Sequence, residues 1–146
     1  MKTLRLLTMV PTALAMSLVF AQTNLAQTTK IQINRNLQSD PLILKGKSRG
    51  TVKSNCGNIT TEPNQVIEVT QSLPYLRLTV ESEGKPTLLI DGPGGRFCVI
   101  ADKYSGGKSE LSGYWQAGTY SLFVGELSPG KPSFNYTLSI SQQTNK

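Results

Sequence analysis

Few side chains in this chain of 146 residues could carry out chemistry. The sequence has no histidine, which removes Ser-His-Asp triads, Cys-His dyads, histidine zinc sites and a histidine general base. The remaining candidates are nine Asp and Glu residues. A hydrolase that used carboxylates alone would need two of them about 5–9 Å apart in a cleft, and no evident insertion forms one. The sequence therefore favours a protein that is not an enzyme, with a carboxylate-only hydrolase as an alternative.

Three acids end or follow neighbouring expected strands and could converge as oxygen ligands. They are Asp91, Asp102 and Glu110. Calcium takes about 6–8 oxygen ligands, some of them carbonyls and waters, and the spacing here fits no EF-hand. We name these residues as candidate Ca²⁺ ligands; the other interpretation is that they cap loops. No further cofactor is expected.

Three aromatic residues flank a Gly-Gly loop and could form a carbohydrate-binding face. Tyr104, Tyr114 and Trp115 surround Gly106 and Gly107, and aromatic rings on a loop can stack on sugar rings. The other interpretation is packing in the core, for which Trp115 is the better candidate.

The first residues have the pattern of a secretory signal peptide. Lys2 and Arg5 precede a mostly apolar run from Leu6 to Phe20, with a cleavage site expected after Ala21. The run has about 15 residues, short of the roughly 20 that a membrane-spanning helix needs. We expect a signal peptide over 1–21, a flexible segment over 22–30 and one domain over 31–146. The mature protein is then secreted or periplasmic, with no stable membrane span after cleavage.

The two cysteines, Cys56 and Cys98, both follow the leader. An even number of cysteines in an exported chain predicts a disulfide, and two free buried thiols are the alternative. A catalytic thiol is disfavoured, because no histidine is present to activate it.

The chain has a mild positive charge, +6 in full. Its densest basic cluster contains Lys45, Lys47, Arg49 and Lys53. The cluster is interpreted as a solvated loop, or else as a site of attraction to an acidic polysaccharide outside the cell. Export and the lack of basic-aromatic interleaving argue against nucleic acid. The expected partners are an extracytoplasmic protein or a polysaccharide.

The elements that must position these residues read as short strands. Apolar residues alternate with polar ones, or run in short apolar stretches, between Gly, Pro, Asn and Ser turns. No stretch after the leader has a helical period free of Gly or Pro. About eight strands at this spacing predict an all-β antiparallel β-sandwich. The expected strands cover 31–33, 42–44, 66–69, 76–80, 87–91, 97–102, 120–124 and 134–140.

Several of these strands resemble, in order, those of the bacterial pre-peptidase C-terminal (PPC) domain family. The resemblance is carried by Leu42–Gly46, Lys85–Ile90, Phe97–Asp102, Ala117–Gly125 and Tyr136–Ile140. It implies a jelly-roll-like β-sandwich that serves as a binding or accessory module without chemistry of its own. We expect this module to contact a protein or envelope polymer through loops at one end. The chain departs from the family in having no attached peptidase and a single acid, Asp102, at the acidic turn.

One element of this resemblance has a physical reason of its own. Gly118 lets the chain turn tightly into a strand. Tyr120 can then bury its ring while its hydroxyl donates a hydrogen bond to loop backbone, as in a tyrosine corner.

Overall fold

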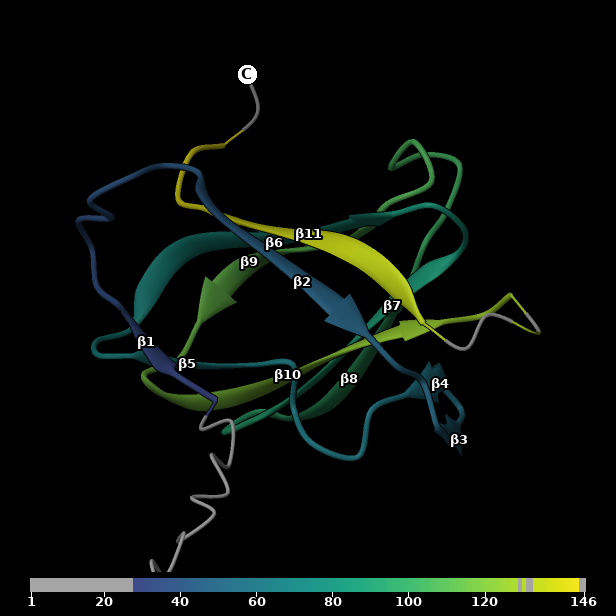
Figure 1. The fold of residues 1–146 in the computed structure, drawn as a ribbon. Coiled ribbons are helices and arrows are strands. Elements are labelled where there is room, and N and C mark those ends of the chain that lie inside the picture. Colours follow the sequence, from purple (N-terminus) through teal and green to yellow (C-terminus); the bar gives the residue numbers. More distant parts are fainter. Residues whose placement is uncertain (1–27, 129, 131–132, 145–146) are drawn as a thin grey trace, which may run out of the picture.

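A computed structural model describes residues 28–128, 130 and 133–144. The expected signal peptide and most of the expected 22–30 segment lie outside these residues. Within them the chain forms eleven strands and no helix, arranged as two sheets packed face to face (Figure 1). The predicted all-β sandwich is confirmed. Its described strands pair in antiparallel fashion, as expected, except that Lys30–Ile33 pairs in parallel with Gln65–Val69.

The two sheets contain seven and four strands. The larger sheet has the order β1-β5-β10-β4-β3, and β7 pairs with both β10 and β8. The smaller sheet has the order β2-β11-β6-β9. The strands of the larger sheet are β1 (Lys30–Ile33), β3 (Val52–Ser54), β4 (Gly57–Ile59), β5 (Gln65–Val69), β7 (Pro86–Gly92), β8 (Gly95–Ile100) and β10 (Gly118–Glu126). Those of the smaller sheet are β2 (Leu42–Ser48), β6 (Leu73–Ser82), β9 (Ser109–Trp115) and β11 (Phe134–Ser141).

Each of the eight expected strands overlaps an observed one, and three observed strands were not expected. Two of these, β3 and β4, have three residues each, too few for an alternating pattern to show. The third, β9, has the sequence SELSGYW, which is polar and contains a glycine. It lies at the edge of its sheet and pairs only with β6 among the described strands, so it does not carry the apolar signal of a central strand.

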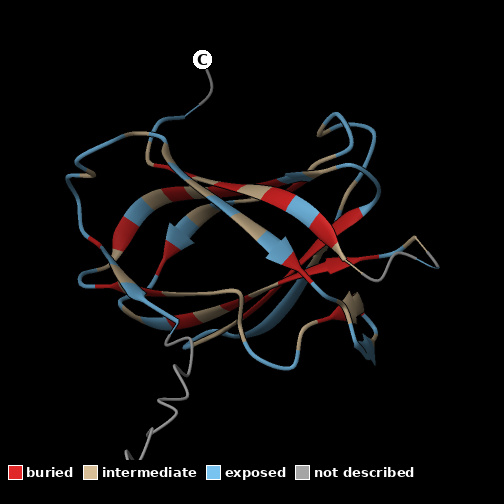
Figure 2. Cartoon of the chain, in the orientation of Figure 1, coloured by how far each residue is buried: buried red, intermediate tan, exposed pale blue. Residues whose placement is uncertain are grey.

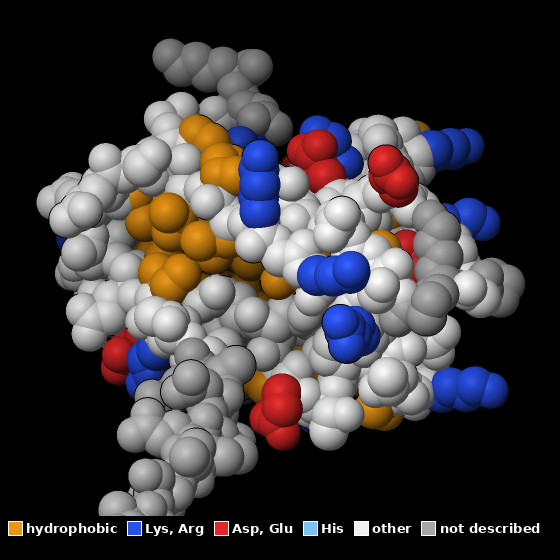
Figure 3. All heavy atoms as spheres, viewed as in Figure 1, with side chains coloured by type: hydrophobic (Ala, Val, Ile, Leu, Met, Phe, Trp, Pro, Cys, Tyr) orange, Lys and Arg blue, Asp and Glu red, His pale blue; other side chains and the backbone are white. Residues whose placement is uncertain are grey.

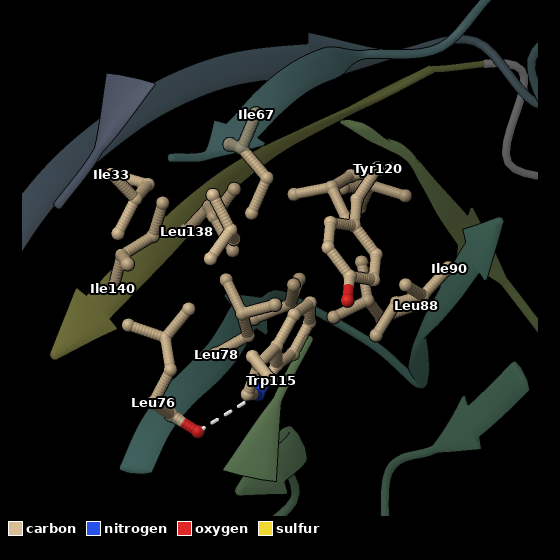
Figure 4. Close-up of a cluster of buried hydrophobic side chains, with 14 of the residues drawn as sticks. Ile33, Ile67, Leu76, Leu78, Leu88, Ile90, Trp115, Tyr120, Leu138 and Ile140 are labelled. Atoms are coloured by element: carbon tan, nitrogen blue, oxygen red, sulfur yellow. Dashed lines mark hydrogen bonds between the residues drawn. The ribbon is translucent and has the colours of Figure 1, made fainter. Parts of the chain in front are cut away.

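The core lies between the sheets and is made by alternate residues of the long strands (Figure 2). Leu76, Leu78 and Val80 of β6 are fully buried, and so are Leu138 and Ile140 of β11. Figure 4 shows Leu78, Leu138 and Ile140 gathered with Ile33 and Ile67 of the larger sheet, in the same cluster as Trp115 and Tyr120. The period of two in the sequence therefore identified the inward faces of the strands.

The predicted disulfide joins Cys56 to Cys98, with Cα atoms 5.6 Å apart. It lies on the outer face of the larger sheet, where Cys56 is fully buried with Ile59 and Leu89. Cys98 is exposed in β8. The disulfide thus fastens the short β3–β4 hairpin to β8, and the alternative of two free buried thiols is wrong.

Candidate binding groove

A groove of about 310 Å³ opens along the side of the sandwich where β8 and β9, each an edge strand of its sheet, lie near each other. It lies along a side of the sandwich, whereas the sequence led us to expect contacts through loops at one end. Its walls are mostly aromatic and aliphatic. The lining residues are Ile90, Gly94, Phe97, Leu111, Ser112, Gly113, Tyr114, Trp115, Gln116 and Tyr120.

The β7–β8 hairpin positions one wall. Gly92 pairs with Gly95, so Pro93 and Gly94 form a two-residue turn, as the glycine-rich sequence predicts. Beyond the turn Phe97 pairs with Ile90, which is buried between the sheets. Paired residues share a face of the sheet, so Phe97 lies on the inward face. No outer strand covers it within the described chain, and 49% of its surface remains exposed.

The floor is formed by two aromatic rings whose polar atoms already have partners. Trp115 and Tyr120 meet edge to face with centroids 4.8 Å apart (Figure 4). The indole Nε1 donates to the Leu76 carbonyl at 3.1 Å, and the Tyr120 hydroxyl donates to the Gln116 carbonyl at 2.7 Å. The second bond is the predicted tyrosine corner. Burial raises the pKa of Tyr120 above 10.0, and the bond to Gln116 acts in the opposite direction.

The rim of the groove is shaped by an irregularity in the smaller sheet. Leu73 pairs with Trp115 and Leu76 with Gly113, so the β6–β9 register shifts opposite Tyr114. Bulges of this kind re-aim side chains and are common beside binding sites. Here Tyr114 is 67% exposed and borders the groove.

The three aromatic residues singled out in the sequence do not form one face. Trp115 is buried, as its alternative interpretation held, and Tyr114 stands at the rim. Tyr104 does not line the groove; it is exposed in the β8–β9 loop beneath the Lys103 ammonium, 5.3 Å from its ring centroid. The sequence placed Phe97 in an expected strand over 97–102 but did not single it out as a groove residue. What the sequence did not reveal is that β8 is an edge strand.

The three candidate calcium ligands are not brought together. Asp91 accepts a hydrogen bond from Arg96 at 2.8 Å near the hairpin turn, whereas Asp102 follows the other end of β8. In an antiparallel hairpin the ends of consecutive strands lie at opposite ends of the sheet, which is why these acids separate. Glu110 accepts a hydrogen bond from Thr79 on β6. Among the described residues no group of three acids or cysteines is placed to hold a metal ion.

Asp102 instead caps the β8–β9 loop. Its Oδ1 accepts the backbone N–H of Ser105 at 2.7 Å. That bond, with the Ser105 hydroxyl, lowers the pKa of the carboxyl below its usual 3.8. The loop-capping interpretation therefore describes this residue.

The basic cluster lies mostly on strands, with Lys53 in β3 and only Arg49 in a loop. Lys45 and Lys47 are exposed residues of β2, with Arg49 directly after it. Figure 3 shows blue side chains crossing this face. Beside them a second opening, of about 420 Å³, lies near β1 and is lined by Ile31, Leu37, Leu42 and several polar residues. Its apolar residues are half-buried, so this opening presents less apolar surface than the β8–β9 groove.

Comparison with known proteins supports the fold. No family model matches the chain. The structure is similar to the pre-peptidase C-terminal domain of collagenase from Bacillus anthracis, with a TM-score of 0.51 and 16% sequence identity, over 78% of this chain and 96% of that one. The resemblance expected from sequence therefore holds at the level of the fold. A periplasmic inhibitor of g-type lysozyme from Salmonella Typhimurium gives a TM-score of 0.44 and 17% identity over 77% of this chain and 98% of that one.

A second comparison, by sequence, finds a relative of this chain. The chain is 32% identical over 120 residues to an uncharacterised protein of Synechococcus elongatus, covering 80% of this chain and 86% of that protein. Such identity over most of both chains indicates common descent. This chain belongs to the same family as the Synechococcus elongatus protein.

Proposed function

We propose that this protein is an exported, non-enzymatic binding module that contacts an extracytoplasmic protein through the β8–β9 groove. The observation that supports this most is the pair of exposed aromatic side chains, Phe97 and Tyr114, above a buried aromatic floor. Large apolar side chains left exposed around a depression are typical of interaction sites. The groove would take apolar side chains of the partner.

The polar chemistry of the groove favours a protein over a sugar. None of the described residues that line it is charged, and its polar side chains besides the aromatic residues are Ser112 and Gln116. The polar atoms of Trp115 and Tyr120 are already bonded within the protein. A saccharide must replace many hydrogen bonds to water on binding, and this lining offers few. A protein is therefore the first candidate partner, and a carbohydrate bound by Tyr114 is the second.

The absence of catalysis is part of the proposal. The described acids Asp91, Asp102 and Glu110 lie outside the groove lining, and each contacts a group within the protein. No two of them share that lining as the carboxylate pair of a hydrolase would need to. A binding role makes no use of such a pair.

Export is proposed on two grounds. The disulfide between Cys56 and Cys98 is of a kind that persists in the periplasm or outside the cell. The first 21 residues have the signal-peptide pattern. Among the residues described by the structure no helix is long and apolar enough to cross a membrane. Intact mass of the exported protein, which should begin at Gln22 and lack two hydrogens, tests both grounds together.

The binding proposal is tested by selection from a random peptide library displayed on phage. Selected peptides should lose at least about tenfold in affinity for the Phe97→Ser variant. The matched control is Ile43→Ser. Ile43 is also about half exposed, at 46%, but it lies on β2, at the edge of the smaller sheet opposite β9 and the groove. Equal loss in both variants, or no Phe97-dependent peptide, would refute the protein-binding proposal. Binding on a glycan array that depends on Tyr114 would replace it with the carbohydrate candidate.

A further inference from the structure

We infer that the partner segment binds as an added strand on the free edge of β8, extending the larger sheet over the groove. This inference rests on the proposed function and specifies how the partner is held. An extended peptide would receive backbone hydrogen bonds from β8 and place alternate side chains in the groove, the mode known as strand addition.

The backbone of β8 presents donors and acceptors at its outer side. The Ala101 N–H donates to the Pro86 carbonyl at 3.1 Å, and the β7–β8 register continues without a shift from there to the turn. In an antiparallel pair alternate residues exchange hydrogen bonds with the partner strand. Phe97 and Val99 therefore bond to β7, while the N–H and C=O groups of Arg96, Cys98 and Ile100 point to the free edge.

The other sheet edges are protected in ways that β8 is not. Exposed strand edges are commonly kept apart by lysines, by shortness or by bulges. Lysines lie at positions 45 and 47 of β2, and β1 and β3 have only four and three residues. The pairing of β9 with β6 contains a register shift. By contrast β8 has six residues in unbroken register. Its charged residue Arg96 is held by Asp91 through two hydrogen bonds.

The groove lies where the inward side chains of such a strand would go. An added strand would sit beside β8 in the larger sheet, and its residues opposite Phe97 and Val99 would face the smaller sheet. There they would meet Leu111 and Trp115, both of which line the groove. Apolar residues at every second position of the partner segment are therefore expected.

The outward side chains of the added strand would meet a different surface. They would lie over the outer face of β8, beside Arg96, the exposed Cys98 and Ile100, which is 47% exposed. The disulfide fixes this part of β8 to the β3–β4 hairpin. The edge is thus held in place before any partner arrives, which lowers the entropy cost of binding.

Two measurements on the peptides selected above test this inference. In the first, each peptide bond is methylated on nitrogen in turn. Methylation at every second residue should weaken binding by on the order of tenfold, through loss of a backbone hydrogen bond and a steric block; methylation at the intervening residues is the control. In the second, amide hydrogen exchange is followed by NMR. Saturating peptide should slow exchange at Arg96, Cys98 and Ile100, with Phe97 and Val99 as internal controls already protected by β7.

The outcomes separate this inference from the proposed function. Peptides that bind in a Phe97-dependent way but leave the three edge amides unchanged, with no alternation on methylation, would overturn strand addition and leave the groove as a binding site. A selection that yields no Phe97-dependent peptide would overturn both. Sedimentation showing that the free protein is already a dimer, with its β8 edge amides protected, would overturn the inference in favour of a second copy of this chain.

Discussion

Removing the disulfide between Cys56 and Cys98 is the perturbation whose effect can best be worked out from the structure. The two residues are 42 positions apart, so the crosslink closes a long loop in the unfolded chain. In the chain-entropy account a loop of this length is worth about 4 kcal/mol at 25 °C. The variant Cys56→Ala with Cys98→Ser also loses one buried sulfur at Cys56, which adds up to about 1 kcal/mol.

The loss should also have a local consequence at the β3–β4 hairpin. Its link to β10 is a single residue pair, Glu126 with Asn58. A buried hydrogen bond from the Thr87 hydroxyl to the Cys56 carbonyl, at 2.6 Å, holds its turn. Without the disulfide the hairpin keeps these two contacts and the packing of Ile59 in the small cluster with Leu89. These are few compared with the contacts of the long strands, so the hairpin should open before the rest of the sandwich.

The assay is urea unfolding followed by Trp115 fluorescence. We expect the free energy of unfolding to fall by about 4–5 kcal/mol and the melting temperature by about 15 °C. Wild-type protein treated with a phosphine reductant keeps both sulfurs, so it isolates the contribution of the crosslink. The double variant must not respond to reductant. A loss below about 1 kcal/mol would refute the reasoning, since it would mean that the unfolded chain gains little freedom when the bridge is absent.

Three further predictions concern the buried tyrosines and the turn at Gly118. Tyr120→Phe removes the hydroxyl of the tyrosine corner and should cost about 1 kcal/mol of stability in urea unfolding; an unchanged midpoint would contradict this. Burial raises the pKa values of Tyr120 and Tyr136 above 10.0, so the folded state favours the neutral phenols. This contribution to stability is complete below pH 10 and is lost as the pH rises through 10 and the folded-state values. Absorbance at 295 nm should show late titration, and Tyr136→Phe should flatten the alkaline loss; an equal loss in the variant would argue against it. Gly118 has φ +148° and a Cβ there would lie 2.3 Å from Pro93 Cγ, so Gly118→Ala should cost more than about 2 kcal/mol. Gly113→Ala, at φ +143° with open space around it, controls for backbone strain alone, and equal losses would rule out the clash.

The candidate site was only partly predictable from the sequence. Trp115 and Tyr114 were singled out because aromatic rings beside the Gly106–Gly107 loop could stack on sugar rings. Phe97 was not, because within a strand an inward-facing apolar residue is normally covered. Its exposure arises since β8 has no neighbour on one side among the described strands, and strand order depends on contacts between segments far apart in the chain.

The acids illustrate the same limit. Asp91, Asp102 and Glu110 follow one another along the chain at strand ends, which suggested that they converge. Antiparallel pairing of β7 with β8 instead places Asp91 and Asp102 at opposite ends of the hairpin. The direction of pairing between strands, which spacing alone does not encode, decided this outcome.

The sequence by itself determined the fold class, the inward face of the main strands, the tyrosine corner and the disulfide partners. These follow from local physics: the period of two along a strand, the freedom of glycine at turns, and the presence of two cysteines alone. Which strands stand at the edges, the groove between β8 and β9, and the separation of the acids were decided by the tertiary structure. They depend on pairings such as β10 with β7 and β11 with β2, whose strands are distant in sequence and whose free energies arise only when the two sheets pack together.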